Sequence, residues 1–320
     1  MYYLNNLDNL PMFMQIKILG ASGFVGRHLG RYLSLHDADV YGISLRENDT
    51  WKSQLIDDGD VIINLVGKAH DHDRRATEND YFHTNLNLTQ DIFRVFCSSN
   101  ATLFIHISSL AAIEEFESEK ALGEENDCRP VSWYGQSKRE AEKWLLAQEV
   151  PEGKKLIILR PPMIHGPGDK GNLGLLYKFV SKGLPYPLSK FNNRRSFISI
   201  TNLCYLIEQI IEKSDLLESG IYHVADDEPM ATNEIIDIIK LVTEKSSIKM
   251  DIPKWLIKLV AKSGDYFSFV PLNTNRLKKM TSTLLVSNQK IKDALGIDKL
   301  PLTAREGMEK TIQSFVVNKR

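Results

Sequence analysis

The stretch that decides the fold is KILGASGFVGRHL, residues 17–29. An apolar run over residues 15–19 predicts a strand, and apolar residues at helical spacing from Phe24 onward predict a helix. The two are joined by three glycines at G-x-x-G-x-x-G spacing, Gly20, Gly23 and Gly26. In a strand–turn–helix unit such glycines permit a tight turn, a close approach of the backbone to a pyrophosphate, and close packing of helix on strand. We therefore expect a dinucleotide-binding turn. For this stretch taken alone, a plain tight turn is the alternative.

The composition is that of an ordinary globular protein. The chain has 320 residues, of which 42% are hydrophobic and 25% charged, and this suits one large α/β unit or two modest domains. A net charge of −1 gives no indication of a nucleic-acid partner. The three cysteines are widely spaced, which excludes a disulfide framework and a Cys-x-x-Cys metal site: Cys97, Cys128 and Cys204. They suit a reducing cytoplasm, where we expect the protein to reside.

No apolar run approaches the roughly 18 to 20 residues that a membrane-spanning helix requires, so we expect no stable membrane insertion. Residues 1–13 lack the basic start and apolar core of a secretory signal, and Met14 is an equally good first residue of the folded unit. The segment 255–260 is apolar but short and contains Lys258. It predicts a helix packed on a second domain, with an interfacial membrane helix as the alternative.

Four further apolar segments predict strands that alternate with helices. The strands are expected over residues 39–44, 60–66, 102–107 and 155–159, and the helices over 79–98 and 134–149. These strands are apolar on both faces, which is typical of a parallel sheet covered by helices on both sides. With right-handed crossovers, the chain is expected to form a Rossmann-like, doubly wound α/β sheet.

The regular alternation ends near Gly168. Beyond it we expect helices over 171–182, 233–245 and 253–263, and isolated strands near 197–200 and 221–224. This pattern predicts two domains. The NAD(P)-binding Rossmann domain covers 14–168 with returns near 196–226, and a smaller, mostly helical substrate-binding lobe covers 169–195 and 227–320.

Tyr134 and Lys138 stand four residues apart at the start of a predicted helix, so they share one face. A tyrosine with its ordinary pKa near ~10 is a poor proton donor or acceptor at neutral pH. A nearby ammonium, together with the charge of an oxidised nicotinamide, stabilises the phenolate and lowers that pKa. The pair predicts acid–base catalysis beside a hydride transfer. An accidental Tyr-x-x-x-Lys is the alternative for the pair alone.

Two serines, Ser108 and Ser109, follow the strand expected over 102–107. The carboxyl ends of parallel strands are where open α/β sheets bind ligands. A hydroxyl at this place orients a reacting oxygen toward the tyrosine. A serine pair that only caps the strand end is the alternative.

In this order and spacing, the glycine motif, the serine after the fourth strand and Tyr-x-x-x-Lys resemble the extended short-chain dehydrogenase/reductases. The resemblance covers about residues 14–310 and includes the nucleotide-sugar 4-epimerase and 4-keto reductase subgroup. Four more segments look like motifs of that family: residues 85–89 (Asn-x-x-x-Thr), 159–168 (its Arg-Pro…Tyr-Gly-Pro-Gly loop), 195–200 (its Arg-Asp-Phe-Ile-His-Val segment) and 287–296 (its closing helix).

The resemblance implies the roles of individual residues. Tyr134 would be the acid/base, Lys138 the ribose-binding partner and Ser109 the substrate-orienting hydroxyl. The residues that would contact the cofactor are Gly20, Ser22, Gly23, Phe24, Val25, Gly26, Arg27, Ser44, Arg46, Leu65, Val66, Gly67, Asn85, Ile107, Tyr134, Lys138, Pro161, Met163 and Ile164.

The implied substrate is a nucleotide-diphosphate sugar. The residues that would contact it are His70, Ser109, Asn172 and Arg195. A guanidinium suits a diphosphate because it binds two oxygens at once. A solvated basic pair, Arg194 with Arg195, is the alternative.

Leu110 and Ala111 bear on the type of reaction. Family members that act as 4,6-dehydratases carry an Asp-Glu pair at these two positions, where it eliminates water. Neither leucine nor alanine transfers a proton, so we expect no dehydration.

The cofactor preference rests on the end of the second strand. An acid there would bind the ribose 2′-hydroxyl and repel a 2′-phosphate, but this chain has Ser44 and then Arg46. Arg27 adds a second cation, whereas Glu47 and Asp49 weaken the signal. The pattern favours NADP(H) over NAD(H).

For the reaction itself, the resemblance favours reduction at C4 of a 4-keto-6-deoxy-N-acetylhexosamine, on a route to bacterial surface polysaccharides. Met163 stands where hexose epimerases carry a sugar-contacting asparagine. An NAD-dependent C4 epimerase like the UDP-glucose 4-epimerases is the first alternative. A non-catalytic dinucleotide-sensing protein is the second, and Ser109, Tyr134 and Lys138 argue against it.

Three further expectations concern other features. Residues 70–73 read His-Asp-His-Asp, but no further ligand group is evident, so a sugar-facing loop is preferred over a metal site. The acidic run over 114–125 predicts a solvated loop. A homodimer through the helices at 79–98 and 134–149 is implied by the resemblance alone.

Overall fold

A computed structural model of the protein describes residues 14–46, 50–57, 59–69, 75–118, 120–169, 171–183, 186, 188, 190–245, 252–267 and 273–317. Within these ranges, every helix is too short or too polar to cross a bilayer.

A six-stranded parallel sheet forms the centre of the molecule, in the order β2-β1-β3-β4-β5-β8. Its strands are β1 (Met14–Leu19), β2 (Ala38–Ile43), β3 (Val61–Asn64), β4 (Leu103–Ile107), β5 (Lys155–Arg160) and β8 (Gly220–His223). The chain runs from β1 to β2 on one side and then back across β1 to β3. This reversal creates a crevice at the carboxyl ends of β1 and β3, the place where doubly wound sheets bind ligands.

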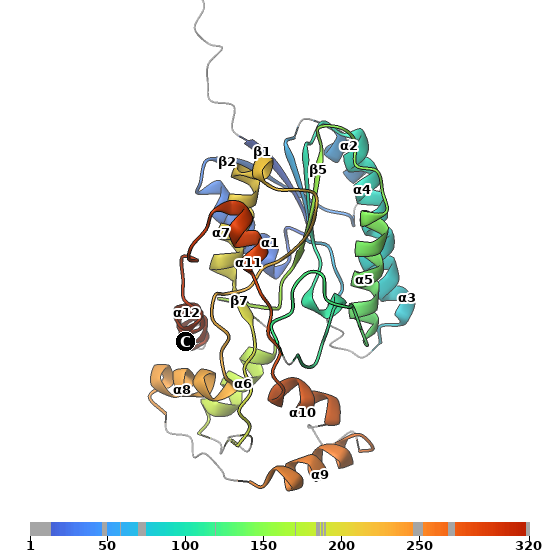
Figure 1. Cartoon of the computed structure of the whole chain (residues 1–320). Coiled ribbons are helices and arrows are strands. Elements are labelled where there is room, and N and C mark those ends of the chain that lie inside the picture. Colours follow the sequence, from blue (N-terminus) through green and yellow to red (C-terminus); the bar gives the residue numbers. More distant parts are fainter. Residues whose placement is uncertain are drawn as a thin grey trace, which may run out of the picture.

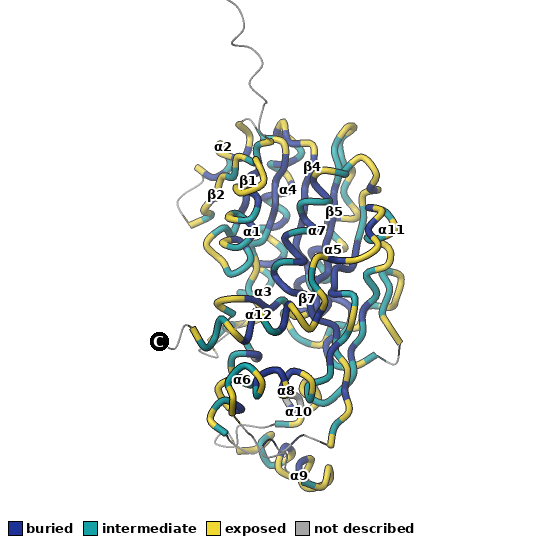
Figure 2. The backbone as a smooth tube through the Cα atoms, turned by 90° about the vertical axis from the view of Figure 1, so that its left-hand side faces the viewer, coloured by how far each residue is buried: buried dark blue, intermediate teal, exposed yellow. Residues whose placement is uncertain are grey.

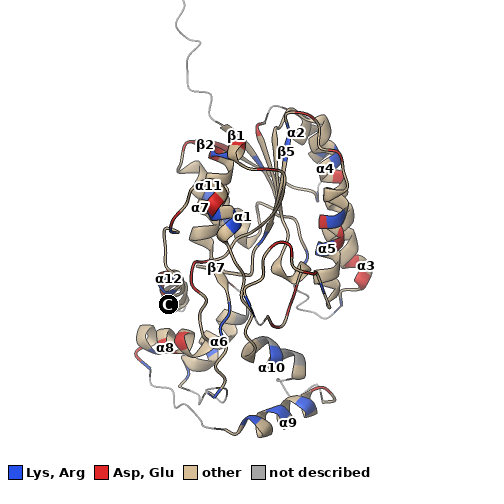
Figure 3. Ribbon diagram, viewed as in Figure 1, with Lys and Arg blue, Asp and Glu red and all other residues tan. Residues whose placement is uncertain are grey.

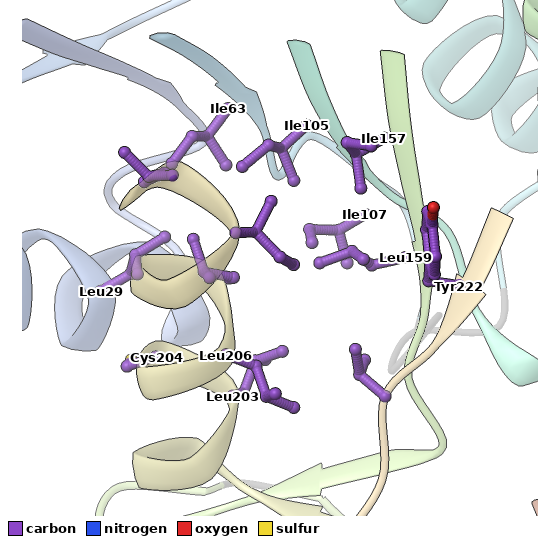
Figure 4. Packing of buried hydrophobic residues seen from close by; sticks show 14 of the residues in the cluster. Leu29, Ile63, Ile105, Ile107, Ile157, Leu159, Leu203, Cys204, Leu206 and Tyr222 are labelled. Carbon is purple, nitrogen blue, oxygen red and sulfur yellow. The ribbon is translucent and has the colours of Figure 1, made fainter. Parts of the chain in front are cut away.

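Helices cover both faces of the sheet, as predicted (Figure 1). One layer contains α1 (Phe24–Ser34), α7 (Ile200–Glu212) and α11 (Gln289–Leu295). The other contains α2 (Thr50–Ile56), α4 (Leu88–Ser98) and α5 (Trp133–Leu146). Each helix layer encloses a hydrophobic core against its face of the sheet: the first core on the α1 and α7 side, and the second core on the α2 and α4 side. Because successive strand residues face opposite sides, Ile63 belongs to the first core and Ile62 to the second. Figure 4 shows Ile63, Ile105 and Ile157 packed toward the side chains of α7.

A smaller lobe lies beyond the carboxyl edge of the sheet and has its own hydrophobic core (Figure 2). It contains the helices α6 (Asn172–Val180), α8 (Thr232–Thr243), α9 (Lys254–Gly264), α10 (Thr274–Thr281) and α12 (Ala304–Val317). A two-stranded parallel sheet of β6 (Met163–His165) and β7 (Phe197–Ser199) links this lobe to the main sheet.

Several elements differ from the sequence prediction, and three of the differences concern helices packed on the main sheet. Residues 200–212 form α7, a helix that the sequence did not predict, although most of its residues are buried against the sheet. Residues 289–300 were assigned to the substrate lobe, but α11 packs on the sheet and belongs to the first core. The helix expected over 79–98 is α3 (Glu78–Phe82), a π-helical turn η1 (His83–Asn87) and α4 in succession.

Candidate functional site

The glycine turn forms one wall of the crevice. Gly20 has φ +82° at the end of β1, and the atom that would be its Cβ lies 3.1 to 3.2 Å from the backbone of Leu65 and Val66. A Cβ on Gly26 would lie 2.5 Å from the carbonyl oxygen of Gly20, a distance that real contacts do not allow. Gly23 caps α1 without a side-chain hydrogen bond, so the N–H groups of the first turn are left for a ligand. This cradle fits the pyrophosphate of a dinucleotide.

The loop after β3 forms the opposite wall, and Asn85 fixes its shape. The Asn85 side chain accepts a hydrogen bond from the Lys68 N–H at 2.8 Å and donates to the Lys68 carbonyl at 3.1 Å and to Ser137 at 2.8 Å. Asn85 is completely buried, so it acts by positioning this loop. The direct contact of Asn85 with a cofactor stays a prediction.

Lys138 lies between the ends of β3 and β4. Its Nζ donates a hydrogen bond to the carbonyl oxygen of Ile107 at 2.8 Å. A Cβ on Gly67 would lie 3.1 Å from the same nitrogen, so a side chain there would crowd the lysine amino group. Burial lowers the pKa of Lys138 to about 8, against the opposing charge of Glu142. The ammonium is therefore held at the crevice in a poorly solvated environment.

Tyr134 lies one turn before Lys138, at the start of α5, and shares a side-chain hydrogen bond with Ser109. Burial raises the pKa of Tyr134, the charge of Glu115 raises it further, and the bond to Ser109 lowers it. The sequence predicted a pKa lowered by Lys138. In the protein alone the direction is the opposite, because desolvation dominates and the Lys138 amino group is directed at the Ile107 carbonyl.

The two serines after β4 have different roles. Ser108 is buried and donates to Glu142 at 2.5 Å. Ser109 is half-buried, caps the short helix η2 (Leu110–Ala112), and faces Tyr134. The N–H of Leu110 donates to the carbonyl of Pro161 at 2.8 Å, which keeps the loop of residues 161–164 beside the serine. The tyrosine, the lysine and one serine therefore meet at the carboxyl edge, as the sequence suggested.

The remaining predicted cofactor residues lie around this edge. Ser22, Arg27, Ser44, Arg46 and Met163 are exposed, whereas Phe24, Val25 and Ile164 are partly buried against the first core. The Arg27 guanidinium donates to the Ser22 carbonyl, and the Arg46 N–H donates to the Ser44 hydroxyl at 3.4 Å. Residues 47–49 lie outside the described ranges.

Arg195 is held where the lobe meets the loop after β4. Its Nη1 donates to the carbonyl oxygens of Phe116 at 3.2 Å and Ser282 at 3.3 Å. Burial lowers its pKa to about 10, and among the described residues it forms no ion pair with a carboxylate. A guanidinium fixed by neutral carbonyls in this way keeps its charge for an anion.

Two predicted substrate residues have no described side chain. His70, with residues 71–74, lies outside the described ranges, so the metal alternative for that stretch remains untested. Asn172 is the first residue of α6, and its side chain is likewise outside the description.

Glu115 is a residue that sequence reasoning missed. It was included in a run expected to be a solvated loop, yet it is buried, and its Oε1 accepts from the N–H groups of Val131 at 3.1 Å and Ser132 at 2.7 Å. That prediction is wrong for Glu115, because the carboxylate satisfies N–H groups at the start of α5. In the sequence, the one feature that pointed to a role for Glu115 near the site was its position six residues after Ser109.

The fold and site define a dinucleotide-binding α/β protein with a Ser-Tyr-Lys constellation at the cofactor edge. The chain belongs to the NAD dependent epimerase/dehydratase family, whose model matches residues 16–225.

Two curated relatives match over nearly the whole chain. A UDP-glucose 4-epimerase from Vibrio cholerae is 28% identical and covers 94% of this chain and 95% of its own. The N-acetyl-alpha-D-glucosaminyl-diphospho-ditrans,octacis-undecaprenol 4-epimerase of Escherichia coli O157:H7 is 23% identical, with 93% and 94% covered.

Two solved structures share the fold. The UDP-glucuronic acid 4-epimerase of Bacillus cereus, in complex with NAD, superposes with a TM-score of 0.76 at 18% identity, covering 96% of this chain and 100% of that one. RMD from Pseudomonas aeruginosa, complexed with NADPH, gives 0.73 at 18% identity with the same coverage.

Proposed function

We propose that the protein is an NAD(P)-dependent oxidoreductase that acts at C4 of a nucleotide-diphosphate sugar. The observation that carries the proposal is the meeting of Ser109, Tyr134 and Lys138 beside a glycine cradle. A bound nicotinamide supplies the hydride chemistry at C4. Tyr134 gives a proton to the C4 oxygen in reduction and takes it in oxidation, and Ser109 orients that oxygen. Lys138 binds the ribose hydroxyls and favours the phenolate by its charge.

The catalytic assignment is tested by Tyr134→Phe. We expect loss of sugar turnover by a factor of about 10² to 10⁴, the usual contribution of a positioned acid–base group, with dinucleotide binding retained. Dinucleotide binding is measured by calorimetry. Unchanged turnover in this variant would show that another group moves the proton.

We propose reduction of a 4-keto-6-deoxy-N-acetylhexosamine as the reaction, with C4 epimerisation as the alternative. Leu110 and Ala111 argue against a dehydratase, and Met163 supports the reductase, whereas the Vibrio cholerae relative supports the epimerase. Stoichiometric NADPH oxidation with a 4-keto substrate identifies a reductase. Interconversion of C4 epimers without net reductant use identifies an epimerase.

We propose NADP(H) as the preferred cofactor because Arg27 and Arg46 are exposed, Arg46 lies beside Ser44, and no acid ends β2. A 2′-phosphate placed there gains two cations. Ser44→Asp is expected to reverse the preference by repelling that phosphate, measured as the ratio of kcat/KM for the two cofactors. Ser34→Asp, an exposed serine at the end of α1, is the matched control.

The substrate's diphosphate is assigned to Arg195. Arg195→Met is expected to raise KM for the sugar while the KM for the cofactor stays unchanged. A lipid-linked sugar diphosphate is a second candidate, since it carries the same diphosphate and the Escherichia coli relative is named for such a substrate. A panel of UDP-, dTDP-, GDP- and undecaprenyl-diphosphate sugars separates the two.

We also propose a homodimer through α4 and α5, as the resemblance implies. Trp133 and Leu146 at the two ends of α5 are about half exposed, as expected of residues that a second copy covers. Light scattering of the wild type and of Leu146→Glu tests this proposal.

A further inference from the structure

The outer face of α9 is apolar and uncovered. Ile257 and Ala261 are buried in the lobe core, whereas Trp255 is 67%, Leu259 59% and Val260 45% exposed. Trp255 and Leu259 are two residues away from the buried positions, which places them on the far side of the helix, whereas Val260 lies at the edge between the buried and the exposed faces. In Figures 1 and 2, α9 lies at the end of the lobe farthest from the sheet.

A row of lysines runs beside this face. Lys254, Lys258 and Lys262 are four residues apart, a spacing that places them on one side of α9, and Figure 3 shows the basic segments of this helix in blue. The Lys254 ammonium lies 5.3 Å from the centre of the Phe191 ring, and Lys258 and Lys262 are exposed. The helix itself has no acidic residue. The carboxylate that follows it, Asp265, accepts hydrogen bonds from the N–H of Thr274 at 2.9 Å and from its hydroxyl at 2.5 Å. The combination of a tryptophan, aliphatic residues and a flanking lysine row is typical of helices that lie in a bilayer interface.

We propose that α9 docks the protein onto an anionic phospholipid surface. The helix lies in the plane of the interface, with Trp255 and Leu259 at the boundary of head groups and acyl chains. Lys258 and Lys262 lie on the lipid phosphates. Charge complementarity selects this occupant, because each lysine near an anionic surface strengthens binding roughly fivefold.

A second copy of the chain fits this face poorly. A standard protein interface uses about 20 to 30 residues a side. The helix α9 is only about 16 Å long and offers four exposed apolar side chains: Trp255, Leu256, Leu259 and Val260. A two-fold contact through the face would also bring both lysine rows together with no acid on either helix.

Docking would hold the diphosphate site close to the lipid. The helix α10 packs on α9, and the carbonyl of Ser282, directly after α10, accepts a hydrogen bond from Arg195. The proposal does not depend on the reaction, since the lipid contact is made outside the crevice.

The test is flotation of the full chain with vesicles of phosphatidylglycerol and phosphatidylcholine, compared with phosphatidylcholine alone, at about 0.1 M salt. We expect binding to the anionic vesicles only. The double variant Trp255→Glu/Leu259→Glu is expected to lose at least about tenfold in affinity, and Lys258→Gln/Lys262→Gln about 25-fold. The matched control is Leu35→Glu/Leu216→Glu, which changes two equally exposed leucines on the sheet half by the same charge and should bind as the wild type does.

A fluorescence measurement keeps the test independent of the folding of those variants. Vesicles should shift the wild-type tryptophan emission to the blue, and Trp255→Phe should abolish the shift while binding remains. The proposal is overturned if the wild type does not float with anionic vesicles, if the control loses as much affinity as the Trp255/Leu259 variant, or if the shift survives in Trp255→Phe. A different outcome is a wild type that fails to float but forms an oligomer that the Trp255/Leu259 variant does not form. That result would overturn the lipid proposal and assign the face to a second copy of the chain. Flotation needs no substrate, so its outcome is separate from that of the proposed reaction.

Discussion

Glu142 and Arg160 form a two-point ion pair inside the protein. Nε of Arg160 lies 2.8 Å from Oε1 of Glu142, and Nη2 lies 2.7 Å from Oε2. Both residues are fully buried, and Ser108 donates to the same carboxylate. Since Glu142 follows Lys138 by one helical turn and Arg160 ends β5, the pair fixes α5 against the sheet next to the candidate acid–base residues. Arg160, which belongs to the segment 159–168 that resembles a family loop, therefore acts from behind the site.

Arg160→Met is expected to lower the free energy of unfolding by about 3 to 5 kcal/mol, because it leaves the Glu142 carboxylate buried without its partner. Urea denaturation measures the loss. Arg305→Met, which breaks the exposed pair of Arg305 with Glu309 at 2.9 Å, is the control and should cost less than about 1 kcal/mol. Equal losses in the two variants would mean that the buried pair has no special role.

Gly26→Ala is expected to abolish dinucleotide binding and to destabilise the protein, because the new Cβ would lie 2.5 Å from the Gly20 carbonyl oxygen and 2.6 Å from Cα of Ala21. Gly30→Ala in the same helix places its Cβ 3.8 Å from Val40, an ordinary contact. That control should be neutral or stabilise the helix by up to about 1 kcal/mol. Calorimetric titration with NADP and NAD checks both variants, and retained binding in Gly26→Ala would contradict the assigned cradle.

Glu115→Gln is expected to lower the pKa of Tyr134, because the variant removes a negative charge that disfavours the phenolate. In the direction of sugar oxidation, where the phenolate accepts the proton, the rising limb of the pH–rate profile should move to lower pH. Glu117→Gln, an exposed neighbour paired with Lys278 at 2.9 Å, should leave the profile in place. A shift to higher pH would contradict the electrostatic role of Glu115.

Activity is expected to fall as the pH rises through about 8, the pKa of Lys138, because the neutral amine no longer stabilises the phenolate. Lys138→Arg keeps the charge at high pH, so this decline should disappear, at a lower overall rate caused by the larger side chain. Lys143→Arg, on the exposed side of α5, is the control. An unchanged decline in Lys138→Arg would place the titrating group elsewhere.

Local sequence patterns were sufficient for the elements that build the crevice. The β1–turn–α1 unit was predictable because its glycines and apolar spacing act within a dozen residues. The helix α5 was predictable because Tyr134 and Lys138 need only helical spacing to share a face. The parallel sheet followed from strands that are apolar on both faces.

The elements and contacts that were missed depend on residues far apart in the chain. Residues 200–212 form a helix because their apolar side chains fill the space between α1 and the sheet, a space that exists only after the sheet has formed. The burial of Glu115 depends on N–H groups 16 and 17 residues away. Likewise, α11 packs on the sheet because β8 adds a sixth strand there.

The sequence by itself determined the family and the sheet and was sufficient to predict the candidate tyrosine, lysine and serine, since the motifs behind each of these depend on short-range spacing. Only the tertiary structure decided that Ser108 is buried against Glu142, that Asn85 and Arg160 are completely buried, and that burial raises the tyrosine pKa. Those outcomes depend on desolvation and on hydrogen bonds between distant segments, and both arise only when the chain has packed.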